Sequence, residues 1–193
     1  MYALVESGTI TKYFSYPQGF TLGDLQYSSD IFTKWSVEEK KAVGIHEVVF
    51  DDSNLKDEEW YINTDQSFVF ANGVVTASYG TATYKAHADV IETISGVESI
   101  TPGLKTNLIR NLKINVANEL NKTDWYITRN AEKSTAIPSA ISTHRDAVRT
   151  QQASMETAIT NAADTAALET LHTYTTTDGV TSRPLGELPV LES

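Results

Sequence analysis

The stretch Ser67-Phe-Val-Phe-Ala-Asn-Gly-Val-Val-Thr-Ala-Ser-Tyr79 decides the first half of the fold. Its centre, Asn72-Gly73, separates two runs of β-branched and aromatic residues, and an Asn-Gly pair in that setting is the strongest short signal of a β-hairpin. Outward from it, four further β-prone runs predict strands, at residues 2–6, 9–13, 45–50 and 60–63. The first two of these runs flank Ser7-Gly8, which predicts a second hairpin.

A short helical insert is expected between these strands. Ser29 or Asp30 is a suitable cap for a helical turn over residues 31–35. Ser36-Val-Glu-Glu39 has the pattern of a capping box, in which the serine and the glutamate side chains each accept a hydrogen bond from the other residue's backbone amide. Gly44 is expected to end the helix that this box begins.

After Gly80 the period of the apolar residues changes. A helix is predicted over residues 83–94, and a longer helix follows with an apolar stripe at every fourth residue. That stripe consists of Leu104, Leu108, Leu112, Val116 and Leu120. Thr123-Asp124-Trp125-Tyr126 is expected to close the long helix, with a loop at residues 132–136.

Two more helices are predicted towards the C-terminus. Pro138 is typical of a helix start, and the helix after it carries a seam at seven-residue spacing, which suits close packing on a neighbouring helix. The seam residues are Ile141, Val148, Met155 and Ala162. Asp164 is a candidate cap for a last short helix over residues 165–172.

Together these patterns predict an α+β fold, with a small antiparallel β-rich N-terminal domain, a C-terminal helical hairpin or bundle and an extended tail. The expected parts are an acidic β-rich domain with the helical insert at 1–80, a linker with a helix at 81–102, the helical part at 103–173 and the tail at 174–193.

The tail is rich in turn residues and shows neither period, yet it contains several leucines and a valine. It is expected to be extended when free and to tie the chain to a neighbour in an assembly. Trp125, at the end of the long helix, is expected to support the open end of the bundle. The residues predicted to contact a partner are Trp125, Leu185, Leu188, Val190 and Leu191.

Charge is distributed unevenly along the 193 residues, which carry 15 Lys and Arg, 25 Asp and Glu and a net charge of −10. Residues 1–100 hold 6 basic and 15 acidic residues, and residues 101–172 hold 8 and 7. This step predicts a solvated acidic module and a nearly neutral packing module. The acidity argues against a nucleic-acid partner, and the lack of cysteine excludes disulfides, thiolate zinc sites and a Cys nucleophile.

No targeting or membrane segment is expected. Residues 1–10 lack the basic and apolar regions of a signal peptide. No run approaches the roughly 18 to 20 apolar residues of a spanning helix. The sequence therefore predicts a chain that is made in a cytoplasm, stays soluble and has no membrane partner.

No catalytic or metal-binding constellation stands out. Carboxylates crowd residues 51–59, but this loop lacks the central Gly and the spacing of a calcium loop and is expected to be solvated. His46 is expected to be paired or partly buried, and His87, His144 and His172 are expected to be exposed. The chain is predicted not to be an enzyme and to have no catalytic residue, metal or cofactor, although a triad assembled in space stays open.

The aromatic side chains suggest core packing more than stacking on sugars or bases, because they alternate with apolar residues. This group comprises Trp35, Trp60, Tyr61, Phe68 and Phe70. Trp125 and Tyr126, at a helix end, are the expected exceptions. Exposure of Trp60 or Tyr61 would instead favour a carbohydrate-binding accessory domain.

Several segments resemble proteins of phage tails. Residues 1–13 are similar to the start of a phage family usually labelled tail fibre or tail assembly protein. Residues 103–120 with Thr123-Asp124-Trp125-Tyr126 resemble the helix-then-Thr-Asp-Trp element of many phage tail and tail-fibre-assembly proteins. Ala136-Ile137-Pro138 and a helix with Arg145 and Arg149 follow here as they do there. Residues 16–79 resemble uncharacterised proteins of marine and cyanobacterial phages.

The resemblance implies a non-enzymatic structural or accessory protein of a phage tail, at the baseplate, a fibre attachment or a similar position. Such a protein would be made in the host cytoplasm, reside in the virion, and dock on other tail subunits or on copies of itself. Two alternatives stay open: a tail or tail-fibre assembly chaperone that is absent from the mature particle, and a carbohydrate-binding accessory domain. The families offer no catalytic residues to carry over.

Overall fold

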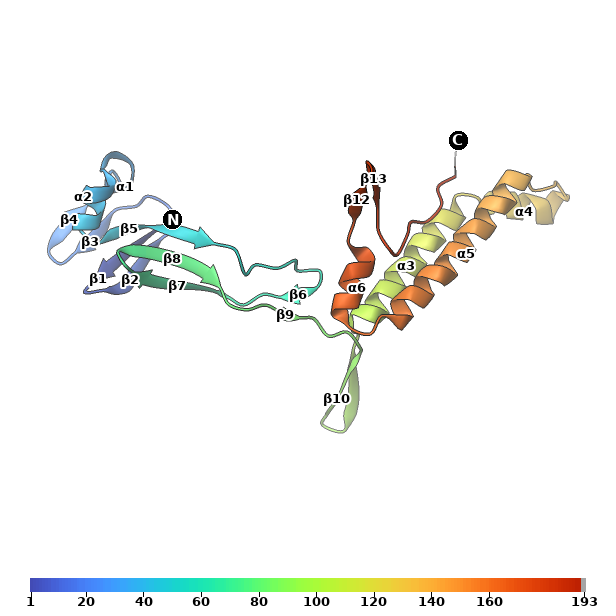
Figure 1. Ribbon diagram of the computed structural model, residues 1–193, viewed down its shortest axis with the longest axis horizontal. Coiled ribbons are helices and arrows are strands. Elements are labelled where there is room, and N and C mark those ends of the chain that lie inside the picture. The colour runs from blue at the N-terminus through green and yellow to red at the C-terminus, as the bar shows by residue number, and fades with distance from the viewer. Residues whose placement is uncertain (192–193) are drawn as a thin grey trace. The chain divides into compact units, whose positions relative to one another are not determined.

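The computed structural model describes residues 1–191 and divides the chain into two compact units, Met1–Thr83 and Tyr84–Ser193 (Figure 1). The first unit is rich in strands, the long helices lie in the second, and the sheets are mainly antiparallel. The predicted α+β class, with a β-rich N-terminal part followed by helices, is confirmed. The first unit ends close to the boundary that was predicted at residue 80.

A five-stranded sheet with the order β2-β1-β5-β8-β7 forms the first unit. Its strands are β1 (Tyr2–Glu6), β2 (Thr9–Phe14), β5 (Ile45–Asp51), β7 (Gln66–Ala71) and β8 (Val74–Tyr79). Every neighbouring pair is antiparallel except β5 with β8, which run parallel. The two edge strands approach each other, because the ring centroids of Tyr13 on β2 and Phe68 on β7 lie 4.7 Å apart.

Both predicted hairpin turns are confirmed. Asn72 and Gly73 have φ angles of 51° and 76°, and Ser7 and Gly8 have 50° and 81°. Positive φ at both central residues defines a type I′ turn, whose twist matches that of the flanking strands. The Asn72-Gly73 turn therefore fixes the register of β7 on β8, whereas the Ser7-Gly8 turn fixes that of β1 on β2 only as far as Val5, where a bulge shifts the pairing.

Two small cores lie on opposite faces of this sheet, because successive side chains of a strand point to opposite sides. Leu4 and Ile45 are paired neighbours on one face, and Ala3 and His46 are paired neighbours on the other. The first core consists of Leu4, Phe14, Phe20, Ile31, Phe32 and Ile45. The second consists of Ala3, Val48, Val75 and Ala77.

Three short elements supply part of the first core: β3 (Phe20–Leu22), β4 (Leu25–Tyr27) and α1 (Ile31–Lys34). The next helix, α2 (Val37–Ala42), has no buried residue. The capping box of α2 is confirmed, since the Glu39 amide donates to Ser36 Oγ at 3.2 Å and the Ser36 amide donates to the Glu39 carboxylate at 2.8 Å. Asp30 is the N-cap residue of α1. Gly44 follows α2 with a φ of 80°, and a Cβ there would lie 2.5 Å from Val5 O.

The predicted solvated loop at residues 51–59 is exposed throughout. It leads to β6 (Tyr61–Ile62), which pairs with β9 (Thr83–Tyr84). Trp60 is buried, and Tyr61, Phe68 and Phe70 are half-buried, as expected for packing residues. Trp35 is more open, with its ring edge-on to that of Tyr27.

In the second unit, α3 (Leu104–Asn121) and α5 (Ser139–Asn161) lie side by side (Figure 1). They are antiparallel, because Lys105 Nζ near the start of α3 donates to Thr160 O near the end of α5, at 2.8 Å. The predicted stripe is confirmed, with Leu112 and Val116 buried and its other members half-buried. The predicted seam along α5 and its C-cap, made of Ile141, Val148, Met155 and Ala162, is buried.

A short helix, α6 (Thr165–His172), follows α5 along the chain. Its predicted cap is confirmed, since the Ala167 amide donates to Asp164 Oδ1 at 2.8 Å. Thr165 is buried in its first turn, and its hydroxyl donates to Lys85 O at 3.0 Å. Leu168 is fully buried.

The prediction of a helix over residues 83–94 is wrong. These residues form β9, a loop and β10 (Val90–Ile94), and β10 pairs with β11 (Val97–Thr101) as a hairpin. Ser95 and Gly96 form its type I′ turn, with φ angles of 55° and 81°. β-branched residues on both sides of such a turn favour strands over a helix.

Helix α4 (Asp124–Lys133) corrects a second expectation, because the chain continues as a helix beyond Tyr126. The loop predicted at residues 132–136 begins only at Ser134, which ends α4 with a φ of 53°. None of the residues of α4 is buried, although its sequence has a polar and an apolar side, and the short break at Lys122 and Thr123 separates it from α3.

The C-terminal segment has extended backbone in β12 (Thr175–Thr177) and β13 (Val180–Ser182), which pair as a third hairpin. The chain then returns to the helices, where Leu185 is buried. The expectation that this segment is free until it meets a partner is therefore wrong for Leu185.

Candidate docking site

A polar cluster at the junction of α3, α4 and α5 fixes the place where α3 ends and α4 begins. The guanidinium Nη1 of Arg145, on α5, donates to Leu120 O at 2.8 Å and to Thr123 Oγ1 at 2.7 Å. The same nitrogen lies 2.8 Å from Asp124 Oδ1. Thr123 Oγ1 in turn donates to Leu120 O at 3.0 Å. We call these four residues the junction cluster.

The chemistry of the junction cluster explains its residue types. Carbonyls of the last helical turn lack partners within the helix and attract cations. Arg145 supplies such a cation at the end of α3, and it is 7% exposed. Thr123 is 1% exposed, and its hydroxyl accepts one of the hydrogen bonds of the buried guanidinium. Burying that charge without hydrogen-bond partners would destabilise the fold. The Thr-Asp pair of the Thr-Asp-Trp element is thus explained by its contact with Arg145.

Sequence reasoning assigned no role to Arg145. A signal was present, because residue 145 lies four positions after the seam residue Ile141 and three before Val148. A charged residue on the buried stripe of a helix requires a partner. His144, three residues after Ile141, carries the same signal.

His144 was predicted to be exposed, and this prediction is wrong, since it is 8% exposed. Its Nε2 lies 3.2 Å from Glu119 Oε1 on α3. A hydrogen bond from the Lys122 ammonium lowers the pKa of Glu119, and His144 contributes to the same shift. His87 and His172 were also predicted to be exposed and are half-buried instead.

Directly after the junction cluster, α4 carries an exposed aromatic platform made of Trp125, Tyr126 and Arg129. The ring centroids of Trp125 and Tyr126 lie 3.7 Å apart at an interplanar angle of 32°. The Arg129 guanidinium lies 4.9 Å from the Trp125 ring centroid and 5.7 Å from that of Tyr126. Trp125 is 51% exposed, so the platform faces solvent and does not close the end of the bundle as the sequence suggested.

The other predicted contact residues have unequal access to a partner. Leu185 is buried in its own chain, where its amide donates to Leu171 O at 3.0 Å. Leu188 and Leu191 are half-buried, whereas Val190 is 77% exposed. Trp125 and Val190 are therefore the two candidates with open side chains, and the structure places them on different elements.

An ionic clamp holds the C-terminal hairpin near Leu185. Two guanidinium nitrogens of Arg183 bind the Glu187 carboxylate: Nε lies 2.8 Å from Oε1, and Nη2 lies 3.0 Å from Oε2. The Tyr174 hydroxyl donates to the same carboxylate at 2.5 Å, and this hydrogen bond raises the pKa of Tyr174. Gly186 packs tightly here, since a Cβ on it would lie 2.7 Å from Gln151 Nε2.

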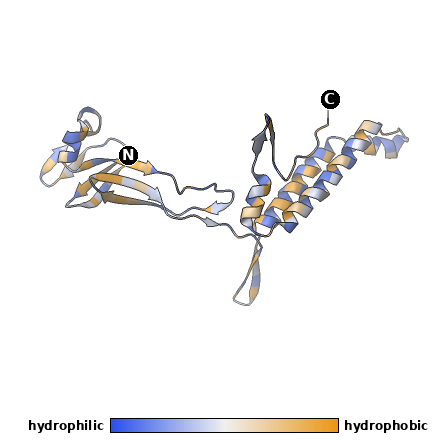
Figure 2. Ribbon diagram, viewed as in Figure 1, coloured by the Kyte–Doolittle hydropathy of each residue, from blue (hydrophilic) through white to orange (hydrophobic). Residues whose placement is uncertain are grey.

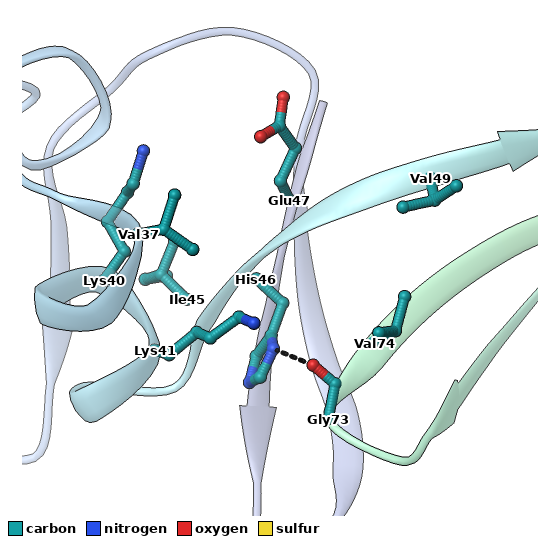
Figure 3. A pocket seen from close by; sticks show the side chains of 9 residues that line it. All are labelled: Val37, Lys40, Lys41, Ile45, His46, Glu47, Val49, Gly73 and Val74. Atoms are coloured by element: carbon teal, nitrogen blue, oxygen red, sulfur yellow. Dashed lines mark hydrogen bonds between the residues drawn. The ribbon is translucent and has the colours of Figure 1, made fainter.

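A hollow of about 140 Å³ lies between α2 and the sheet of the first unit (Figure 3). Its wall includes Val37, Val49 and Val74, together with Lys40 and Lys41. The dashed line in Figure 3 marks the hydrogen bond that His46 Nδ1 donates to Gly73 O at 3.2 Å, which ties β5 to the Asn72-Gly73 turn. The side chain of His46 thus has a structural role in the sheet.

Among residues 1–191, no three His, Asp or Glu side chains gather as a possible metal site. Within that same range, no helix is long and apolar enough to span a membrane.

Comparisons with known proteins find no matching family model, no matching curated protein and no matching solved structure. The resemblance to phage tail proteins stays a prediction from the residues quoted for it, among them Thr123, Asp124 and Trp125.

Proposed function

We propose that the chain is a non-enzymatic structural or accessory protein of a phage tail, and that it acts by docking the aromatic platform of α4 onto another tail subunit. The observation that carries this proposal is the stack of the exposed Trp125 ring on Tyr126 and Arg129, which are half-buried. Trp, Tyr and Arg are the residue types most enriched among those that dominate binding energy at protein interfaces.

The platform is also held in place before any partner binds. The junction cluster sets the first turn of α4, so Trp125 and Tyr126 start from a defined position. Arg129 packs on both rings, which limits the rotamers they have to give up on binding. Preorganisation of this kind raises affinity because it lowers the entropy cost of association.

A helix without buried residues supports the same interpretation. The ten residues of α4 contribute no buried side chain to the described part of the unit. A helix gains most of its stability from a packed face, so an unpacked one suits a surface that is completed by a partner. The class of partner comes from the resemblance of the Thr-Asp-Trp element to that of many phage tail and tail-fibre-assembly proteins.

Mass spectrometry of purified phage particles tests the proposal. We expect peptides of this chain in particles that carry its gene. We further expect that Trp125→Ala combined with Arg129→Ala depletes the chain from particles while the purified variant stays folded. Tyr16→Ala is the matched control, since Tyr16 is 65% exposed on the first unit and should leave incorporation unchanged.

Each other outcome has a defined meaning. Absence of the unaltered chain from finished particles, with normal expression in infected cells, would contradict the structural role and favour an assembly chaperone. Equal incorporation of the double variant would contradict docking through α4. Binding of the unaltered chain to a glycan array, lost in the double variant, would favour the carbohydrate-binding alternative; Trp60 is buried and offers no stacking face to a sugar.

A further inference from the structure

The β10–β11 hairpin lies apart from the helices of its own unit, and all ten of its strand residues are exposed (Figure 1). Five of the ten are β-branched apolar residues, each at least 40% exposed: Val90, Ile91, Ile94, Val97 and Ile100. Figure 2 shows hydrophobic stretches along this hairpin. Its exposed apolar side chains pack on no helix or sheet in the described part of the chain.

The hairpin is nevertheless well defined. Its five cross-strand pairs run without a register shift from Ile94–Val97 at the turn to Val90–Thr101 at the base. At that base, the Gly103 amide donates to Asp89 Oδ1 at 2.8 Å, and the Leu104 amide donates to Ala86 O at 2.9 Å. The hairpin is thus a preformed arm tied to the start of α3.

Such an arm requires a partner for two reasons. A two-stranded hairpin alone is marginally stable in water, and three or more strands with an apolar face are needed for independent stability. Monomeric proteins also protect free strand edges with Lys, Pro or bulges. Residues 90–101 contain no Lys and no Pro, and their pairing contains no bulge.

We propose that β11 pairs antiparallel with β11 of a second copy of this chain, about a two-fold axis at Ser99. The product is a four-stranded sheet with the order β10-β11-β11-β10. This interface is separate from the aromatic platform of α4 and does not rest on the function proposed for it.

The charges of the two strands select β11 over β10. Pairing β11 about Ser99 sets Val97 opposite Thr101 and Glu98 opposite Ile100, so no like charges lie directly opposite each other, and the two Glu98 side chains are only diagonal neighbours. The corresponding full-length pairing of β10 is centred on Glu92 and sets this carboxylate directly opposite its copy. Like charges directly opposite each other destabilise a sheet.

Hydrogen-bond geometry agrees with this register. Next to a two-residue turn, Ile94 and Val97 form a hydrogen-bonded pair, and hydrogen-bonded and non-bonded pairs then alternate along the hairpin. The amides and carbonyls of Glu98 and Ile100 therefore point outward, away from β10. In the proposed dimer, each Glu98 exchanges both of its hydrogen bonds with Ile100 of the other copy.

The same register brings isoleucine side chains of the two copies near each other. Ile91 and Ile100 are cross-strand neighbours within one copy. Ile100 of one copy lies diagonal to Ile100 of the other, a separation that large side chains bridge. The dimer thus covers exposed isoleucine surface and completes a four-stranded sheet.

Oxidative crosslinking of the full chain tests the axis, because the protein has no cysteine of its own. In Ser99→Cys the two thiols meet at a non-hydrogen-bonded pair, where Cα atoms are about 4.5 Å apart and a disulfide is sterically allowed. We expect a covalent dimer from Ser99→Cys. The matched control is Glu92→Cys, whose residue is paired with Ser99 on β10, and it should remain monomeric.

Analytical ultracentrifugation over a range of protein concentrations tests whether the chain dimerises through the free edge of β11. Glu98→Pro removes an outward-pointing donor and no β10–β11 hydrogen bond, and Thr93→Pro does the same on the free edge of β10. We expect the unaltered chain and Thr93→Pro to dimerise and Glu98→Pro to be monomeric, all with the same helical circular dichroism. A monomeric unaltered chain, a dimeric Glu98→Pro, or crosslinking of Glu92→Cys but not Ser99→Cys would overturn the proposal.

Discussion

Replacing Arg145 with alanine should destabilise the helical unit by about 3 kcal/mol. Arg145 is buried and is hydrogen-bonded to Leu120 O and Thr123 Oγ1. A hydrogen bond to a charged group contributes about 1.5–3 kcal/mol, and loss of the side chain also leaves a void at the junction. The ion pair with Asp124 adds little, because that carboxylate is half exposed.

Urea titration followed by ellipticity at 222 nm measures this loss, since the long helices lie in the second unit. With a denaturant slope of about 2 kcal/mol per molar urea, the midpoint should fall by about 1.5 M. Arg149→Ala is the matched control on the same helix. Arg149 is exposed and pairs with Asp146 at 3.4 Å, so its loss should cost less than about 0.5 kcal/mol.

A double-mutant cycle separates the hydrogen bond from the packing of the arginine. Thr123→Val and Arg145→Met each remove one partner, and together they remove both while keeping most of the volume. The double variant should be less destabilised than the sum of the two single variants. Arg145→Ala with the midpoint of Arg149→Ala, or additive effects in the cycle, would show that the junction cluster does not hold α3, α4 and α5 together.

Three further predictions concern other contacts. The pKa of Glu119 is lowered in the folded state, so its ionised carboxylate stabilises the fold fully above about pH 4.3, and this stabilisation is lost as the pH falls through the lowered pKa. Between pH 5 and pH 3 the free energy of unfolding should therefore fall more for the unaltered chain than for Glu119→Gln. Leu185→Ala should cost about 2–4 kcal/mol because the residue is buried, whereas Val190→Ala should be neutral in the same thermal melts. Asn72→Val places a β-branched residue at a φ of 51° and should destabilise the first unit by about 1–2 kcal/mol, whereas Asn72→Gly should be nearly neutral.

These three also have contradicting outcomes. Parallel acid titrations of the unaltered chain and Glu119→Gln would show that Glu119 titrates alike in the folded and unfolded states. Equal melting of the variants at 185 and 190 would place Leu185 outside the core. A stable Asn72→Val variant, measured by the backbone amide shifts of β7 and β8, would mean that the turn is not type I′.

The sequence predicted the elements that local chemistry determines. Asn72-Gly73 allows the two consecutive positive φ values that few other pairs tolerate, and the turn has that geometry. Ser36 and Glu39 form the capping box, and Asp164 caps α6. The four-residue repeat that begins at Leu104 identified the packed face of α3.

The sequence did not reveal elements whose stability comes from elsewhere in the chain. Residues 83–94 have no competing period strong enough to exclude a helix, and Ser95-Gly96 was treated as an interruption when it is the turn of a hairpin. Residues 123–126 were interpreted as the end of the long helix, so the second helix that begins at Asp124 was not predicted.

The candidate site was predicted only in part. Trp125 was singled out as a contact residue, and its side chain is open to a partner. Tyr126 and Arg129 join it through stacking, which depends on α4 being helical, and that helix was not predicted. Leu185 looked available because it is apolar and lies near the C-terminus. Burial against its own helices depends on the return of the chain after β13, which no local pattern encodes.

The parallel pairing of β5 with β8 has a consequence for the order of folding. It joins Val48 to Val75, and β1 joins Tyr2 to Glu47, so the sheet depends on residues far apart in the chain. Folding slows as the mean sequence separation of contacts rises, and helical units with local contacts fold faster. During synthesis, β5 cannot pair with β8 until Tyr79 has left the ribosome, and until then the edge of β5 that later binds β8 is unpaired. The half of the chain that is made first is thus expected to reach its structure more slowly, and it is the half that needs protection from aggregation.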